Sequence, residues 1–282
     1  MIEVLSPGFY TTIQEVSRQG FRHLGVPLSG PMDQTAFTVA NALLPHPMDQ
    51  CVLECTMIGP TLKIRAVLRF VLTGATVEAW LDDRPLEMNK VYQTAVGSEL
   101  KLRKVIKGLR TYLRFEAVLD LPIYFGSKSF FEPITKQHRL KKGDSIALQS
   151  HPETLSQNNA SLRVDSSYLN ATELAVNFGP DWEMLPAQSQ EQLLAEEHSV
   201  EAQDRMGYQL STSVRFNAPK LLSQLVFPGM LQLTPGGKLL VATADCQVTG
   251  GYLQVLQLTP RALDVLVQKS EGEKLTFQSK LH

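Results

Sequence analysis

Apolar and polar residues alternate along much of this chain, and this period of two restricts its fold more than any other feature. Residues 76–81 alternate in this way and run into a turn-like Asp-Asp-Arg-Pro at 82–85, which predicts a hairpin. A second alternating run at 100–103 precedes Gly108 and the segment 112–115, where we expect another turn. Short strands at such spacing are typical of barrels and sandwiches. The sequence therefore predicts a mainly β (β-dominated α+β) protein.

Helical periodicity is confined to a few segments. Apolar residues recur on one face of 33–44, between a Gly-Pro pair and a stop at Pro45, which predicts one amphipathic helix. A second helix is expected at 188–198, where the chain is rich in Gln, Glu and Leu.

The stretch 150–167 loses the alternation and becomes rich in Ser, Asn and Thr, which suits an exposed connection. We therefore predict two lobes: an N-terminal β lobe carrying the amphipathic helix at 1–160, and a C-terminal β-barrel lobe at 161–282.

Charge and cysteine content exclude several classes of partner. Lys and Arg total 27 against 28 for Asp and Glu, so no net field favours nucleic acid or an anionic membrane. The three cysteines, Cys51, Cys55 and Cys246, are too few for a disulfide framework and lack the companions of a zinc site. We expect reduced core thiols and no metal.

The sequence also lacks the signals of export and of membrane insertion. The start of the chain has neither a basic nor an apolar leader region. The best apolar run, 66–72, is interrupted by Arg69 and is far below the roughly 20 residues that a membrane helix needs. We expect a soluble, cytoplasmic protein.

The motifs of several common enzymes are missing. The sequence contains no phosphate-binding G-x-x-x-x-G-K-[ST], no H-E-x-x-H, no G-x-S-x-G and no strand-coupled G-x-G-x-x-G. The nearest imitation, Gly236-Gly237-Lys238, lies between two apolar runs and is better explained as a hairpin turn. No histidine-based nucleophile system is apparent either, which argues against covalent catalysis.

Polar residues and glycines gather just before the predicted helix at 33–44. Backbone N–H groups at a helix start suit a carboxylate or phosphate, and Arg18 could add a forked, charge-assisted pair. Alternatively, this is a structured turn in which Ser29 or Asp33 simply caps the helix. The candidate site residues of this segment are Thr12, Gln14, Arg18, Ser29 and Gly30.

Two later segments carry further candidates. Asp204 and Arg205 stand just before a glycine and Tyr208, and they could serve a site or form a surface ion pair. The third segment follows an apolar strand and contains Asp245 and Thr249-Gly250-Gly251. Its glycines could present an anion-binding nest or form a tight turn at positive φ.

Together these segments resemble one family in their order along the chain and in their residues. The chain resembles the biotin-dependent carboxyltransferase-like family, which includes the 5-oxoprolinase C subunit, the Kip-inhibitor antagonist, the so-called allophanate hydrolase subunit 2 and the carboxyltransferase region of urea carboxylase. The resemblance covers essentially the whole chain. The matching residues include Thr11-Thr12-Ile13-Gln14, Arg18, Gly25, Gly30, Asp33, Leu53-Glu54-Cys55-Thr56, Gly179-Pro180, Asp204 to Tyr208, Gln232, Asp245 and Gly250-Gly251-Tyr252.

The resemblance implies cyclophilin-like β-barrel lobes and a subunit of an ATP-dependent hydrolase that opens the lactam of 5-oxoproline. ATP would enter through the complex, and the partners would be a B-type subunit of the same family and a lactam-binding A-type subunit. Arg18, Arg205, Asp204 and Asp245 would be the catalytic candidates, with Tyr208 and the Thr-Gly-Gly segment among the substrate-binding ones.

Two other functions stay open at this point. One is a regulatory binding subunit of the Kip-antagonist type. The other is a carboxyltransferase component that works with a separate biotin carrier. No covalent biotin is expected on this chain, because the segment around Lys90 lacks the Met-Lys-Met type of attachment sequence.

The chain departs from the family pattern at several positions. An acid and a glycine of the usual Gln-Asp-x-Gly-Arg are replaced by Glu15 and Ser17, and a threonine of the last motif by Val248. A usual Gly-Gly turn is replaced by Phe-Glu-Ala-Val-Leu at 115–119, and a usual arginine by Ala175. We expect the fold to tolerate these changes, which instead put the usual substrate and the full catalytic rate in doubt.

Overall fold

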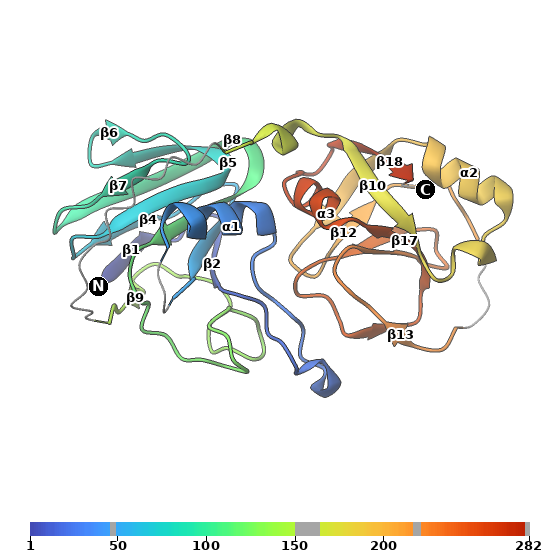
Figure 1. The fold of residues 1–282 in the computed structure, drawn as a ribbon, viewed down its shortest axis with the longest axis horizontal. Coiled ribbons are helices and arrows are strands. Elements are labelled where there is room, and N and C mark those ends of the chain that lie inside the picture. The colour runs from blue at the N-terminus through green and yellow to red at the C-terminus, as the bar shows by residue number, and fades with distance from the viewer. Residues whose placement is uncertain (46–48, 150–163, 217–220, 280–282) are drawn as a thin grey trace. The chain divides into compact units, whose positions relative to one another are not determined.

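The computed structural model describes residues 1–45, 49–149, 164–216 and 221–279. Strands dominate, with three α-helices in these ranges, so the prediction of a mainly β protein is confirmed (Figure 1). The chain forms two compact units. Unit 1 comprises Met1–Ser17 and Asp33–Leu169, and unit 2 comprises Arg18–Met32 and Asn170–His282.

This division differs from the expected lobes of 1–160 and 161–282 in two respects. Residues 164–169, which were expected in the C-terminal lobe, group with unit 1. The segment Arg18–Met32 groups with the C-terminal unit, although it precedes most of unit 1 in sequence. The expected boundary and most of the expected connection, 150–163, lie outside the described residues.

Unit 1 is a nine-stranded sheet in which the hydrogen-bonded order β2-β3-β8-β4-β1-β9 is extended by β5, β6 and β7. Its pairs are antiparallel, as expected for strands joined by short turns. The strands are β1 (Ile2–Ser6), β2 (Tyr10–Gln14), β3 (Val52–Thr56), β4 (Thr61–Ile64), β5 (Arg69–Leu81), β6 (Arg84–Pro85), β7 (Val91–Gln93), β8 (Ser98–Phe115) and β9 (Ser145–Ile146).

The long ladder of β5 with β8 tests two of the predicted turns. The hairpin at 82–85 is confirmed, because β5 and β6 pair across Asp82, which has φ 54°. The turn predicted at Gly108 is wrong, since β8 continues through it. Gly108 has φ 84°, and the register shifts between 74 and 79 on β5 show that the ladder absorbs the irregularity as bulges.

Helix α1 (Gln34–Leu43) covers one face of the unit 1 sheet. Asp33 caps it, because its Oδ1 accepts a hydrogen bond of 2.8 Å from the Ala36 N–H. The helix buries Ala36, Phe37 and Ala40 against Val71 and other residues of the sheet, while the larger apolar core lies in a separate cluster. The capping expectation is therefore met by Asp33.

Unit 2 is built on a closed seven-stranded barrel of order β10-β17-β14-β15-β12-β11-β18. Closure leaves no unpaired edge in this described barrel, and a separate ribbon joins β13 and β16. The strands are β10 (Glu173–Phe178), β11 (His198–Gln203), β12 (Gly207–Leu210), β13 (Gln224–Leu225), β14 (Met230–Leu233), β15 (Leu239–Ala242), β16 (Thr249–Gly250), β17 (Leu253–Leu258) and β18 (Lys274–Ser279).

The connections of unit 2 include two helices, α2 (Ala187–Ala195) and α3 (Pro260–Leu266), and two 3₁₀ turns, η1 (Arg22–Leu24) and η3 (Trp182–Met184). A further 3₁₀ turn, η2 (Ser167–Asn170), joins the units along the chain. The hairpin predicted at Gly236-Gly237 is confirmed, because β14 and β15 pair around it and Gly237 has φ 71°.

Two searches of the described residues find nothing. None of their helices is long and apolar enough to cross a membrane. No group of three or more His, Cys, Asp or Glu side chains among them is placed to hold a metal ion. The three cysteines are buried and unbridged, as expected.

Candidate functional site

The segment Arg18–Met32 is tied into unit 2 by hydrogen bonds from backbone and side chain. The Ser29 N–H donates to the Ala244 carbonyl over 2.9 Å. The Arg22 guanidinium donates to the Val226 carbonyl and lies 4.4 Å from the centre of the Phe227 ring. The candidates Arg18, Ser29 and Gly30 therefore belong to the same unit as Arg205.

Arg205 is 7% exposed and makes a forked pair with Asp245. Its Nε lies 2.7 Å from Asp245 Oδ2, and its Nη2 lies 3.3 Å from Oδ1. Nη2 also donates to the Gly30 carbonyl over 2.7 Å. Three of the predicted site residues thus meet in unit 2, where the guanidinium joins the 18–32 segment to the loop after β15.

Asp204 shapes the turn between β11 and β12. It is exposed, and its Oδ1 accepts hydrogen bonds from the N–H groups of Met206 at 2.7 Å and Gly207 at 2.9 Å. Tyr208 is 1% exposed, and its hydroxyl reaches the backbone carbonyls of Val267 and Lys269. In this conformation the Tyr208 hydroxyl is used in hydrogen bonds to the backbone of unit 2.

The Thr249-Gly250-Gly251 segment does not form the tight turn at positive φ that was one of its two interpretations. Thr249 and Gly250 form β16, and neither glycine has a positive φ. The close approach of two neighbouring side chains instead explains why residue 250 is a glycine. A Cβ there would lie 3.1 Å from Gln232 Nε2 and 3.1 Å from Val226 Cγ2, closer than side chains normally pack.

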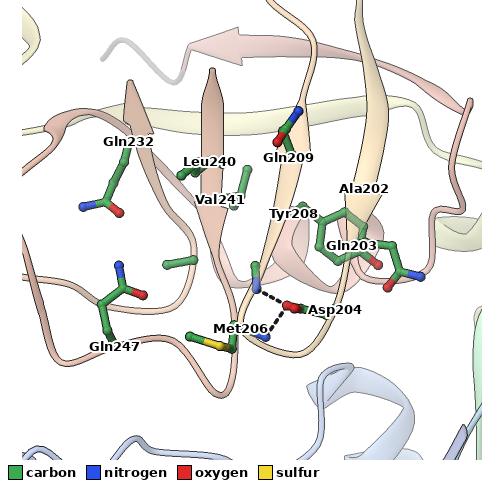
Figure 2. Close-up of a pocket in the computed structure, with 12 residues that line it drawn as sticks. Ala202, Gln203, Asp204, Met206, Tyr208, Gln209, Gln232, Leu240, Val241 and Gln247 are labelled. Atoms are coloured by element: carbon green, nitrogen blue, oxygen red, sulfur yellow. Dashed lines mark hydrogen bonds between the residues drawn. The ribbon is translucent and has the colours of Figure 1, made fainter. Parts of the chain in front are cut away.

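A pocket of about 270 Å³ opens on unit 2 beside these elements (Figure 2). Four of its side chains are glutamines, and Asp204 is the one charged side chain among the described residues of the lining. It is lined by Ala202, Gln203, Asp204, Met206, Gly207, Tyr208, Gln209, Gln232, Leu240, Val241, Ala242 and Gln247.

Gln232, on β14, is the distinctive residue of this pocket. It is 2% exposed, yet its Nε2 finds no hydrogen-bond partner among the described residues. Figure 2 shows the ends of Gln232 and Gln247 pointing toward one another. The Cβ position of Gly250 lies within 3.6 Å of both amide nitrogens. The candidates Asp204 and Gly250 therefore flank one glutamine-rich pocket.

Thr12 and Gln14 belong to unit 1, where both are fully buried on β2. Gln14 Nε2 donates to Thr12 Oγ1 over 3.0 Å and to the Phe130 carbonyl over 3.3 Å. On the neighbouring strands, the Tyr112 hydroxyl donates to Glu54 Oε2 over 2.9 Å. Burial, and then the Glu54 charge, raises the pKa of Tyr112 well above its ordinary value.

Two of the departures from the family pattern are accommodated in the fold. Glu15 Oε2 accepts a hydrogen bond of 2.9 Å from the Lys128 N–H. Phe115, Val118 and Leu119 replace the usual glycine turn, and each is 2–4% exposed. These apolar residues therefore stabilise unit 1 by burial.

The comparison with protein families decides the classification. The family model described as "Carboxyltransferase domain, subdomain A and B" matches residues 24–279. The chain belongs to this family. The classification agrees with the resemblance noted from the sequence and with the β-barrel architecture.

Individual relatives in this family fall into two kinds. The chain is 27% identical to the 5-oxoprolinase C subunit of Escherichia coli over 98% of its own length and 90% of that protein. The solved structure of TTHA0988 superposes with a TM-score of 0.87 at 25% identity, covering 99% of this chain and 55% of that one. The urea amidolyase of Kluyveromyces lactis gives a TM-score of 0.86 at 25% identity, covering 98% of this chain but 18% of that chain.

Proposed function

We propose that this chain is the C-type subunit of an ATP-dependent hydrolase that opens the lactam of 5-oxoproline to glutamate. The observation that carries the proposal is the match to the 5-oxoprolinase C subunit, which spans nearly the full length of both chains. In contrast, the chain corresponds to a small part of the urea amidolyase.

The chemistry explains why such an enzyme would need several subunits. A lactam is a resonance-stabilised amide, so its oxygen must be activated before water can attack the carbonyl carbon. The described lining of the glutamine-rich pocket has no Lys or Arg and one Asp, so its residues do not fit a triphosphate. We therefore assign ATP binding to the partners of the complex, a B-type and an A-type subunit.

The residues of unit 2 would provide oriented polar groups around the reacting atoms rather than a nucleophile. Arg205 and Asp245 fix the turn that carries Asp204, and this turn lines the pocket. Oriented groups of this kind lower a barrier because they need not reorganise as charge develops. Arg18, the other cationic candidate from the sequence, lies in the same unit but not in the described lining of the pocket.

The test is reconstitution with the proteins encoded beside this chain. Co-expression should yield a stable complex that consumes 5-oxoproline only when ATP is present. The purified chain alone should show no turnover. Full activity of the isolated chain, or a complex with no 5-oxoproline-dependent ATP hydrolysis, would refute the proposal.

The family description favours one rival, a carboxyltransferase component. That function requires a biotin carrier on another polypeptide. Carboxyl transfer from a carboxylated carrier, measured with the same complex, would replace the hydrolase proposal. A complex that forms but has neither activity would indicate a regulatory subunit of the Kip-antagonist type.

A further inference from the structure

We infer that the pocket of unit 2 binds a neutral planar amide group, –CO–NH–, as found in a small lactam, and that Gln232 is its primary anchor. This inference deepens the proposed function by assigning the lactam end of the ligand to named residues of this chain, in place of the lactam-binding role that the resemblance implied for the A-type partner. It rests on the proposed function only for the choice of 5-oxoproline as the natural ligand.

The first argument is the position of Gln232. It lies in β14, whose residues Met230–Leu233 are all buried, so the strand otherwise suits apolar side chains. A buried donor without a partner costs about 1–3 kcal/mol. Among the described residues Nε2 has no acceptor, and Gln232 lines an open pocket although Nε2 itself has almost no exposed surface. A ligand in the pocket that accepts its hydrogen bond after a small rotation of the side chain explains it best.

The second argument is chemical complementarity. A carboxamide carries both a donor and an acceptor, so the facing amides of Gln232 and Gln247 can offer an N–H to a ligand carbonyl and a carbonyl to a ligand N–H. Leu240, Val241 and Ala242 supply apolar contacts for a ring. The described pocket is thus complementary to a cyclic amide.

The third argument concerns charge and size. Asp204 is the one charged side chain of the described lining, so a ligand carboxylate is repelled and must remain at the solvent side. Pockets for drug-sized ligands measure about 300–1,000 Å³, so 270 Å³ suits a smaller molecule. We expect the uncharged lactam 2-pyrrolidinone to bind at least as tightly as 5-oxoproline.

Two adjacent glycines provide a matched pair of variants. A Cβ at Gly250 would crowd the Gln232 amide, at 3.1 Å from its nitrogen, and would make an ordinary contact with the Gln247 nitrogen at 3.6 Å. A Cβ at Gly251 would meet nothing closer than the Leu221 carbonyl oxygen at 3.9 Å, among the residues that the structure describes. Neither glycine has a positive φ, so alanine brings no backbone strain at either position.

The experiment measures binding to the full-length chain by ligand-observed NMR and calorimetry. The probe is 2-pyrrolidinone, and N-methyl-2-pyrrolidinone and cyclopentanone serve as controls that lack the N–H donor. We expect the lactam to bind at least tenfold more tightly than either control. Gly250→Ala should weaken binding at least tenfold, and Gly251→Ala less than twofold.

Gln232→Leu gives the sharpest readout. It should abolish binding of 2-pyrrolidinone while leaving the melting temperature unchanged or raised, because the variant removes an unpaired buried amide. Asp204→Asn should tighten binding of 5-oxoproline relative to 2-pyrrolidinone, since it removes the charge that repels the carboxylate.

Three outcomes would overturn the inference: no binding of 2-pyrrolidinone, equal binding of cyclopentanone, or unchanged affinity in a folded Gln232→Leu variant. Failure of the proposed function is distinguishable from failure of the pocket. A complex without 5-oxoprolinase activity whose isolated chain still binds the lactam would refute the function alone. An active complex whose activity survives Gln232→Leu would refute the pocket alone.

Discussion

Both units contain buried arginines, and Arg114 of unit 1 and Arg205 of unit 2 have different roles. Arg114 in unit 1 donates to the backbone carbonyls of Leu44, Cys51 and Asp49. The carboxylate of Asp49 accepts a 2.6 Å hydrogen bond from Lys128 Nζ. Arg205 in unit 2 instead forms a forked pair with Asp245 beside an open pocket.

The contrast teaches which buried charges indicate a site. In unit 1, burial lowers the pKa of Arg114. Burial alone would also lower the pKa of Lys128, but the hydrogen bond to Asp49 and the neighbouring negative charges together raise it overall. The cluster ties loops to the sheet, and protein atoms supply these contacts. In unit 2, an accessible pocket and the unpaired amide of Gln232 adjoin the pair, as far as the described residues show. Open volume with an unpaired polar group marks the site, and buried charge alone does not.

The largest expected effect is in the unit 1 cluster. Asp49→Ala should lower the free energy of unfolding of unit 1 by about 3–5 kcal/mol, because it leaves the charges of Arg114 and Lys128 buried without this carboxylate. Urea unfolding in a Trp182→Phe background reports on unit 1 through Trp80, since the chain has two tryptophans.

The control is Glu3→Gln, which breaks the exposed pair of Glu3 with Arg65 and should cost at most about 1 kcal/mol. Equal costs for the two variants would show that the unit 1 cluster is no more than a surface-type pair. Lactam binding to the pocket of unit 2 should be unchanged in Asp49→Ala at temperatures where the variant is folded.

A smaller effect is expected for Arg205→Lys. Lysine keeps the charge but cannot reproduce the planar fork to Asp245, so we expect a loss of about 1–3 kcal/mol in stability. The turn that carries Asp204 should also lose its position, and binding of 2-pyrrolidinone should weaken about tenfold, or about 1.4 kcal/mol. Calorimetry well below the melting temperature separates the two losses.

Arg215→Lys is the matched control, because Arg215 also holds backbone carbonyls of unit 2, those of Thr212, Val214 and Gly237. It should affect stability without changing lactam affinity. If Arg205→Lys and Arg215→Lys behave alike, Arg205 has a structural role only.

Much of the fold could be predicted because short segments of the sequence specify it. The alternation at 76–81 and the acids that follow specify a hairpin, and Asp33 ahead of an apolar period specifies a helix start. The turn at Gly108 was predicted wrongly because glycine at positive φ serves equally as a turn or as a bulge in a continuous strand.

Long-range contacts were not predictable from the sequence. Arg18–Met32 joins unit 2 through bonds such as Ser29 to Ala244, which no local pattern signals. Arg205, Asp245 and Gly30 were predicted as site residues and do meet. Gln232 was not among the predicted site residues; a polar side chain inside the buried strand β14 is the signal that could have identified it.

The smallest expected effect compares one thiol in each unit. Burial raises the pKa of Cys246 in unit 2 to about 11, although the Arg22 charge lowers it in part, and it raises the pKa of Cys55 in unit 1 to about 12. The unfolded thiol ionises first, with a pKa near 9, so each contribution to stability is complete below pH 9 and decreases as the pH rises toward the folded-state value. At pH 10 the loss from Cys246 is about 1 kcal/mol.

Cys246→Ala should therefore remove part of the pH dependence of unit 2 between pH 9 and 11. The free energy of unfolding of unit 2, followed through Trp182 in a Trp80→Phe background, measures this. Cys55→Ala is the matched variant and should leave that curve unchanged while flattening the curve of unit 1. Identical pH profiles for wild type and Cys246→Ala would mean that the Cys246 thiol has the same pKa in the folded and unfolded chains, and fast thiol labelling of the native protein at pH 8 would contradict its burial.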